Sequence, residues 1–295
     1  MDLPRKTVRY FQELRSRGLV GRTLRSGLTD VWRFGPGGHI RYGFEVVGVK
    51  SRMPVRYPGT NLAFRVRTTP FWKYWKMLEA GAHDLESFRF LSSFVKPGQI
   101  VLDVGAWEGP YSLLFGELVG REGSVIAFEP DPKASAILRD NVEASGLANV
   151  RVEDLCLSNV EGSALFFDSS GGTIGTLIRN ELVGTFRQVA VTTTTLDRYC
   201  REHLVRMDGL KVDVEGAEAL VVEGARDSIA RFSPWMFLEF HGVLMSEAER
   251  QKSWASITGP ARAMTFVWGK SKRYGAGDPL DGYPDCDYFH VLIQY

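Results

Sequence analysis

Residues 100–109 read IVLDVGAWEG, a short apolar run that changes at once into a turn with two glycines. The run at 100–104 has the length and composition of a strand buried on both faces, as in a parallel sheet. Gly105 and Gly109 let the backbone approach a ligand closely, and the free N–H groups of a helix that starts there can bind it. Their GxxxG spacing differs from the GxGxxG turn that binds a pyrophosphate. We therefore expect a strand–turn–helix unit that binds a ligand without phosphate groups.

The alternation of strands and helices continues on both sides of this turn. Helices are predicted at residues 84–95, 109–119 and 132–145, and from Gly216 onward. Core strands are predicted at 100–104, 124–129, from Val150, and at 210–214, 235–240 and 288–293. Two more strands, at 164–167 and 188–194, flank a glycine-rich connection at 168–187 that we expect to be a mobile lid. The repetition of βαβ units predicts an α/β fold with a doubly wound, mostly parallel sheet.

The first 80 residues differ in charge from the rest of the chain. Residues 1–80 contain 16 Lys and Arg against 5 Asp and Glu, whereas residues 81–295 contain 20 against 30. This asymmetry predicts a basic accessory region at 1–80, with a helix at 5–17 and short strands between 39 and 67, followed by a ligand-binding domain at 81–295. The basic region either packs against the acidic one, within the chain or in a homodimer, or attracts an anionic acceptor or a membrane surface.

The remaining composition is that of an ordinary globular protein of 295 residues, 44% hydrophobic and 24% charged. Cys156, Cys200 and Cys286 are widely spaced and form no CxxC pair, so the sequence indicates neither a zinc site nor a disulfide framework. No stretch has the apolar length of a signal peptide or of a membrane span. These features predict a cytoplasmic protein with reduced thiols and no transmembrane segment.

Acidic side chains follow the next two strands after the glycine turn. Glu129 ends the strand at 124–129, about twenty residues after Gly109. A carboxylate there can accept hydrogen bonds from both ribose hydroxyls of an adenosine cofactor, although a solvated carboxylate at a strand end would look the same. Asp154, near the end of the third strand, is a candidate for contact with the adenine ring. Glu153 competes for that role, and either residue could be plain surface charge.

Charge is most concentrated in the segment LKVDVEGAE. Apolar and charged residues alternate there, so Lys211, Asp213 and Glu215 share one face of a strand, where burial is costly without partners or a ligand. The next strand ends in FLEFH, which places Glu239 and His241 on one side. In an open α/β sheet both strand ends face the ligand. The cluster predicts a divalent-cation site or a general base, with a hydrogen-bonded core histidine as the alternative for His241.

The segments VLDVGAWEGPYS, IAFEPDP, TTTTLDRY, LKVDVEGAE, VVEGA and FLEFH occur in this order and resemble the FkbM family of S-adenosylmethionine-dependent methyltransferases. The resemblance covers residues 84–241, and LKVDVEGAE is its most specific part. It implies a class I methyltransferase fold, which is Rossmann-like, with the last strand at 288–293 antiparallel to the others. Two features depart from the family. Trp107 stands where a small polar residue is commoner, and the first 80 residues match no part of the pattern.

The family pattern also assigns roles to single residues. It implies that Asp103, Gly105 and Gly109 line the S-adenosylmethionine site and that Glu129 binds the ribose. Glu86 matches an acidic position near the methionine part of the cofactor. The full set of expected cofactor-binding residues is Glu86, Asp103, Gly105, Ala106, Gly109, Glu129, Asp154 and Glu215.

The resemblance further implies a small-molecule or glycan acceptor, because members of the family methylate hydroxyls of sugars, glycolipids or secondary metabolites. A hydroxyl is a poor nucleophile at neutral pH and needs a base or a metal ion to remove its proton. The expected catalytic residues are His241, Asp213, Glu239 and Lys211. If Mg²⁺ takes part, the ligands expected for it are Asp213, Glu239 and His241. The sequence has no NPPY motif, which disfavours methylation of nitrogen.

Two other functions stay open at this point. A nicotinamide-dependent oxidoreductase could use Glu129 to hold its ribose, but the GxGxxG turn is missing. A non-catalytic nucleotide-binding scaffold of the same fold is the second alternative, and it gives no reason to bury the charges of LKVDVEGAE. A nucleic-acid partner is not expected, because the basic residues of the first region come without an aromatic stacking platform.

Overall fold

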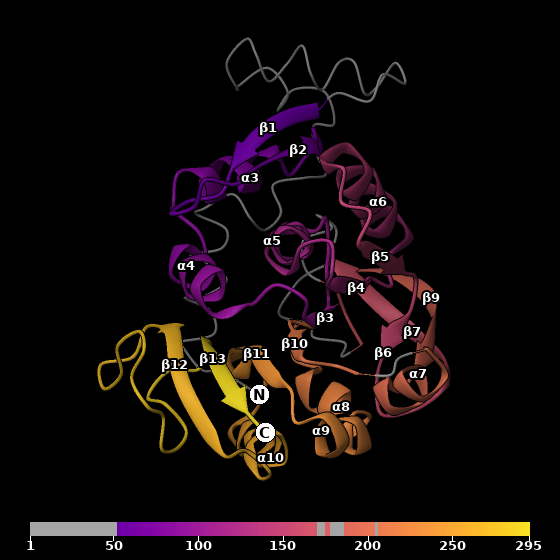
Figure 1. The fold of residues 1–295 in the computed structure, drawn as a ribbon. Helices are drawn as coiled ribbons and strands as arrows, with labels where there is room; N and C mark the ends of the chain where they lie inside the picture. Colours follow the sequence, from indigo (N-terminus) through magenta and orange to yellow (C-terminus); the bar gives the residue numbers. More distant parts are fainter. Residues whose placement is uncertain (1–51, 170–174, 178–185, 204–205) are drawn as a thin grey trace.

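The computed structural model describes residues 52–169, 175–177, 186–203 and 206–295, and Figure 1 shows how their elements are arranged. The helix predicted at 5–17, the first of the short strands and most of the connection at 168–187 lie outside the described residues. Within them the chain forms a seven-stranded central sheet, helices on both of its faces, and two smaller sheets. None of the helices in these ranges is long and apolar enough to cross a membrane.

The central sheet contains the buried strands that the sequence predicts. Its strands are, in spatial order, β12 (Ala263–Gly269), β13 (Phe289–Gln294), β11 (Trp235–Phe240), β10 (Gly209–Val212), β3 (Ile100–Val104), β4 (Ser124–Phe128) and β5 (Val150–Glu153). The strands from β11 to β5 run parallel, whereas β13 is antiparallel to β11 and to the edge strand β12. The predicted α/β, class I methyltransferase fold with an antiparallel last strand is confirmed.

Helices cover the two faces of this sheet in separate layers (Figure 1). One layer holds α4 (Leu85–Phe94), α5 (Pro110–Val119) and α6 (Pro132–Ser145). The other holds α7 (Leu196–His203), α8 (Glu218–Glu223), α9 (Arg226–Phe232) and α10 (Glu247–Thr258). Successive strand residues point to opposite faces, so Val101 is buried under the first layer and Leu102 under the second. Burial on both faces explains the unbroken apolar runs of these strands.

Local signals fix the start of the helix that follows β4. Asp131 caps α6 by accepting hydrogen bonds from two backbone N–H groups of the first turn, at 2.7 and 3.0 Å. Pro132 is the first helical residue, and Gly146 ends the helix in the left-handed conformation. The cap therefore holds the loop that contains Glu129 against the carboxyl end of β4.

A second sheet lies between β5 and α7 in the sequence. Its strands, in spatial order, are β6 (Cys156–Leu157), β9 (Phe186–Thr194), β7 (Gly162–Ser169) and β8 (Gly175–Thr176). β7 pairs antiparallel with both β8 and β9. The two strands predicted at 164–167 and 188–194 therefore exist, and they pair with each other outside the central sheet.

An N-terminal hairpin packs on the first helical layer. It consists of β1 (Arg52–Arg56) and the antiparallel β2 (Ala63–Arg67), and α3 (Trp72–Glu79) follows it. Val55 and Val66 are fully buried in the same core as Leu113 of α5. Arg67 forms an ion pair of 3.1 Å with Asp140 of α6. The hairpin thus shares its core with the central unit, and the division of the chain at residue 80 stays a prediction.

Candidate active site

The carboxyl ends of β3, β4 and β10 meet at one edge of the central sheet and border a cavity. The lining residues at these strand ends include Gly105, Trp107, Glu129, Asp213 and Glu215. The second sheet covers another side of the cavity with residues of β6, β7 and β8. Ligands of open α/β sheets bind at this edge. The cavity lies where the sequence predicts the cofactor.

The glycine turn leaves no room for side chains. Gly105 has a φ of +79°, and a Cβ on it would lie 1.8 Å from the backbone oxygen of Asp213. Gly109 has a φ of +96°, and a Cβ there would lie 2.4 Å from a methyl carbon of Leu138. Both positions favour glycine for their conformation, and Gly105 also requires it for space, because the atom it would meet belongs to the backbone. Gly105 lines the cavity, and Gly109 lies behind it at the start of α5.

Two other predicted cofactor residues support this turn from inside the protein. Asp103 is fully buried, accepts a hydrogen bond from Ser112 Oγ at 2.6 Å and lies 3.4 Å from Nζ of Lys211. Ala106 is buried, and its backbone N–H donates to the carbonyl of Phe128 at 3.1 Å. The structure therefore places Asp103 and Ala106 next to the cavity but not in its lining.

Glu129 is oriented by two backbone N–H groups. Trp107 donates to Oε2 at 2.7 Å, and Asp131 donates to Oε1 at 2.8 Å. Burial raises the pKa of Glu129 to about 7, against the lowering effect of these two hydrogen bonds. Each carboxylate oxygen still has a lone pair for a ribose hydroxyl. The geometry is compatible with the predicted contact to the ribose.

The structure keeps two predicted cofactor residues away from the cavity. Asp154 accepts hydrogen bonds from Ser135 and from Arg139, the latter at 2.9 Å, and its side chain is 58% exposed. Glu86 is exposed in the first turn of α4. Neither carboxylate lines the cavity. The predicted contacts of Asp154 with adenine and of Glu86 with the methionine part have no support in this geometry.

Trp107 joins the glycine turn to the N-terminal segment, a contact that no sequence pattern indicated. Its backbone has a φ of +49°, and its ring lies edge-on to Tyr74, with centroids 4.9 Å apart, and to Phe71 at 5.6 Å. The next residue, Glu108, accepts a hydrogen bond from Trp75 Nε1 at 3.0 Å. Residues on both sides of the predicted division at residue 80 are therefore in direct contact next to the glycine turn.

Lys211 is buried beneath the cavity and joins two strand ends. Its Nζ lies 3.4 Å from Asp103 and 3.2 Å from Asp213, and it donates to the carbonyl of Gly105 at 3.2 Å. Burial alone would lower the pKa of this ammonium, but the charges of the two carboxylates raise it above its ordinary value. Lys211 is therefore a permanent cation that holds Asp213 beside the glycine turn.

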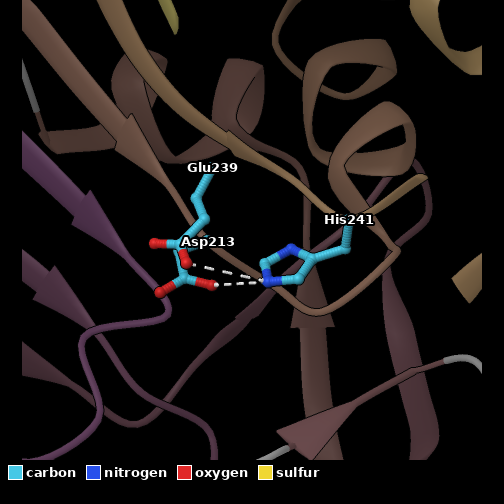
Figure 2. A group of neighbouring side chains, drawn as sticks. All are labelled: Asp213, Glu239 and His241. Carbon is cyan, nitrogen blue, oxygen red and sulfur yellow. Dashed lines mark ion pairs between the residues drawn. The ribbon is translucent and has the colours of Figure 1, made fainter. Parts of the chain in front are cut away.

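His241 lies at the centre of the predicted charge cluster (Figure 2). Its Nδ1 is 2.8 Å from Oε1 of Glu218. Its Nε2 is 3.9 Å from Asp213, 3.9 Å from Glu239 and 3.4 Å from Glu215. Glu215 has a left-handed φ of +53°, which is uncommon for a residue with a side chain. The structure thus brings together Asp213, Glu239 and His241, and it adds Glu215 and Glu218 to them.

Glu239 is held by groups from β13 and from the loop before it, together with α4. Tyr288 donates its hydroxyl to Oε1, and Nε2 of His290 lies 3.2 Å from the same oxygen. Oγ of Ser87, on α4, lies 2.5 Å from Nδ1 of His290. Burial alone would raise the pKa of Glu239, but the charge and hydrogen bond of His290 and the charge of His241 lower it. Glu239 is therefore a stable anion, and its partners on β13 and α4 were missed from the sequence.

The pKa values of the other groups of the cluster are raised, in contrast to that of Glu239. Burial and the charge of Glu239 raise the pKa of Asp213 to about 6. Burial also raises the pKa of Glu215 to about 8, although the charge of His241 lowers it. Burial alone would lower the pKa of His241, but the charges of Glu215 and Glu218 outweigh this effect and raise the pKa well above its ordinary value. An imidazole in these surroundings carries a proton at neutral pH and is not a free base.

A family comparison assigns this site to a known class of enzyme. The model of the methyltransferase FkbM domain matches residues 80–267, more than half of the chain. The chain belongs to the FkbM methyltransferase family. It is therefore an S-adenosylmethionine-dependent methyltransferase, as the resemblance predicts, and the oxidoreductase alternative is set aside. The match includes the glycine turn, Glu129 and the cluster around His241, and it ends before His290.

Individual relatives of this FkbM methyltransferase are distant. The "probable cobalt-precorrin-6B C(15)-methyltransferase (decarboxylating)" of Sulfolobus acidocaldarius is 44% identical over 55 residues, which are 19% of this chain and 29% of that protein. The chain thus aligns with less than a third of that curated relative.

Solved structures with a similar fold have low sequence identity. A methyltransferase FkbM from Methylobacillus flagellatus KT is 13% identical and covers 75% of this chain and 54% of its own, with a TM-score of 0.41. An rRNA methylase from Streptococcus thermophilus is 12% identical, and the match covers 70% of this chain and 93% of the methylase, with a TM-score of 0.42. A SAM-dependent O-methyltransferase from Thermotoga maritima is 12% identical, and the match covers 85% of this chain and 80% of that enzyme, with a TM-score of 0.43.

Proposed function

We propose that this FkbM methyltransferase transfers the methyl group of S-adenosylmethionine to a hydroxyl group of a small molecule or glycan. The observation that supports this is the carboxylate cluster around His241, which borders the same cavity as the cofactor turn. Asp213 and Glu215 line that cavity, and Nε2 of His241 lies within 3.9 Å of both. An alcohol loses a proton during methyl transfer, so a proton acceptor beside the methyl donor is what the reaction needs.

The reaction is a displacement at the methyl carbon. The acceptor oxygen forms a bond to this carbon while the carbon–sulfur bond breaks, and the electron pair stays on sulfur. The products are a methyl ether, neutral S-adenosylhomocysteine and a proton, which passes to a base of the protein. The methyl group is already activated on the cofactor, so the protein mainly aligns the acceptor and excludes water.

Asp213 is the best-placed base in the described cluster. Its side chain is 25% exposed, compared with 9% for Glu239 and 1% for His241. With a pKa of about 6 it is ionised at neutral pH and more basic than an ordinary aspartate. In this proposal Lys211 positions Asp213, the anion of Glu239 raises its basicity, and His241 positions both carboxylates. In this proposal His241 is a positioning residue and not the base.

A divalent cation such as Mg²⁺ is the other means of lowering the pKa of the acceptor hydroxyl. Asp213, Glu239 and His241 offer three ligand atoms that lie within 4.8 Å of one another. Carboxylate oxygens with one imidazole nitrogen form a donor set that such cations accept. When bound, the cation supplies Lewis-acid polarisation of the acceptor oxygen. In both cases the hydroxyl loses its proton at the same cluster.

The acceptor class comes from the family resemblance: sugars, glycolipids or secondary metabolites. Two similar proteins, an rRNA methylase and a probable cobalt-precorrin-6B C(15)-methyltransferase, are named for other acceptors, which compete with a hydroxyl. A cytoplasmic location, and a homodimer through the basic region at 1–80, remain predictions.

Product analysis tests the proposal. The protein is incubated with ¹³C-methyl-labelled S-adenosylmethionine and a panel of hydroxylated, amine-containing and RNA acceptors, and nuclear magnetic resonance locates the label. We expect a methyl ether, with little product from Asp213→Asn and normal product from Asp281→Asn, a surface control whose side chain is 73% exposed. A label on nitrogen or carbon would contradict O-methylation. Equal rates in the two variants would contradict the role of Asp213.

A further inference from the structure

Four side chains converge on one region beside the cavity, with the spacing of ligands around a cation. The oxygens of Glu215, Asp213 and Glu239 lie 3.4, 3.9 and 3.9 Å from Nε2 of His241, and Figure 2 shows the latter two pairs. These separations exceed the usual N–H···O hydrogen bond of about 2.7–3.2 Å. Ligand atoms about 2.1 Å from one octahedral ion are about 3.0 Å apart when adjacent and about 4.2 Å apart when opposite. The observed distances fall between these two values.

The orientation of His241 supports a ligand at Nε2. Oε1 of Glu218 lies 2.8 Å from Nδ1 and also accepts a hydrogen bond from the backbone N–H of Gly216 at 2.9 Å. Glu218 is fully buried, and this contact assigns a proton to Nδ1. The proton that Nε2 carries at neutral pH then lies among three carboxylates, and a bound cation can replace it at this point. A carboxylate that fixes the imidazole tautomer is the usual partner of a metal-bound histidine.

The charges around this point do not balance within the described part of the chain. Five carboxylates form the cluster: Asp103, Asp213, Glu215, Glu218 and Glu239. The cations paired with them are Lys211, His241 and His290. When all five are ionised, the carboxylates outnumber the cations by two even with both imidazoles protonated. Burial of net negative charge is costly. The sulfonium of the cofactor supplies one positive charge before methyl transfer and none afterwards. A divalent cation that replaces the proton of Nε2 also adds one positive charge, and this charge stays at the site after the methyl group has left.

We propose that Asp213, Glu215, Glu239 and Nε2 of His241 bind one divalent cation, with Glu218 as the residue that orients the imidazole. Neither Glu215 nor Glu218 belongs to the ligand set predicted from the sequence. A set of three carboxylates and one imidazole, without thiolate, suits Mn²⁺ or Mg²⁺. The inference rests on the proposed function in one respect: the cation lies where it can polarise the acceptor hydroxyl.

Binding of Mn²⁺ to the full chain tests this site without any turnover. Electron paramagnetic resonance counts bound Mn²⁺, and electron spin-echo modulation of the wild-type complex detects a directly bound imidazole nitrogen. We expect one Mn²⁺ per chain and a nitrogen signal. Glu239→Gln should weaken binding by at least about tenfold, and Glu218→Gln, which leaves all four ligands in place, by about 10–100-fold. Asp281→Asn is the matched surface control and should bind normally.

The outcomes separate this inference from the proposed function. A wild-type complex without a nitrogen signal overturns the site, whether or not the variants fold. Equal Mn²⁺ affinity in Glu239→Gln and Asp281→Asn, both shown to be folded by thermal melting, overturns it as well. Formation of methyl ether at full rate in the presence of a chelator contradicts a role for the cation and supports O-methylation. Mn²⁺ binding at His241 together with a methylated nitrogen or carbon supports the cation site and contradicts O-methylation.

Discussion

The two halves of the cavity are built by different means. On the half that we propose for the cofactor, around β3 and β4, the backbone defines the shape: Gly105 has no room for a Cβ, and Glu129 is held by two main-chain N–H groups. On the half that we propose for the acceptor, around the end of β10, side chains hold one another by charge, with His241, which follows β11, between three carboxylates. A backbone-built site is sensitive to added volume, and a charge-built site is sensitive to lost charge. Substitutions in the two halves should therefore separate cofactor binding from chemistry.

The largest effect on turnover is expected on the acceptor half. His241→Ala should lower turnover by about 10–100-fold, because it removes the group that holds Asp213 and Glu239 together at the site of proton removal. The affinity for S-adenosylhomocysteine, measured by calorimetry, should change little. His203→Ala, at an exposed histidine of α7, is the control for loss of an imidazole. Comparable turnover in the two variants would mean that the chemistry lies elsewhere.

The cofactor half should respond to volume rather than to charge. Gly105→Ala places a methyl group 1.8 Å from a backbone oxygen, so we expect a loss of at least about 3 kcal/mol in the free energy of unfolding. Gly98→Ala is the matched control, because Gly98 has a similar φ of +81° and nothing within 4 Å of its Cβ position. It should cost only about 1 kcal/mol of conformational strain. Urea unfolding of both variants checks this, and equal losses would show that packing at the turn is unimportant.

The smallest effect is a pH dependence of cofactor binding on the same half. The pKa of Glu129 is raised to about 7, so its carboxyl is mostly protonated at pH 6 and mostly ionised at pH 8. Ribose hydroxyls donate to the ionised form more strongly. Affinity for S-adenosylhomocysteine should therefore rise by about tenfold from pH 6 to pH 8. Calorimetry across this range should show a flat profile in Glu129→Gln; the same slope in the variant would assign the titration to another group.

The sequence predicts the elements of the central sheet well, because buried parallel strands carry unbroken apolar runs. The edge strand β12 was missed. Its pairing with β13 shifts register between Phe266 and Trp268, and this irregularity breaks the period of two. The strands at 164–167 and 188–194 were predicted, but not that they form a separate sheet, because apolar alternation does not specify the partner of a strand.

The site divides in the same way. The positions of Gly105, Glu129 and Asp213 follow from strand ends, since the carboxyl ends of parallel strands share one edge. The contact of Ser87 with His290 spans 203 residues of sequence, and no local pattern can indicate it. Asp154 follows the third strand as predicted, and Arg139 and Ser135 of α6 bind its carboxylate, so its contact with adenine stays a prediction. The order of the strands predicts at which edge of the sheet a residue lies, and tertiary packing decides which groups its side chain contacts.

The central claim is that one half of the cavity binds the cofactor and the other carries out proton removal. The most direct test measures two quantities in Glu129→Ala and Asp213→Asn: the dissociation constant of S-adenosylhomocysteine, a neutral ligand, and the single-turnover rate at saturating cofactor. We predict that Glu129→Ala loses about 2–3 kcal/mol of binding with little change in rate. Asp213→Asn should keep its affinity within about 0.5 kcal/mol and lose at least about 100-fold in rate. If both variants lose affinity and rate in parallel, the two halves act as one unit and the claim is wrong.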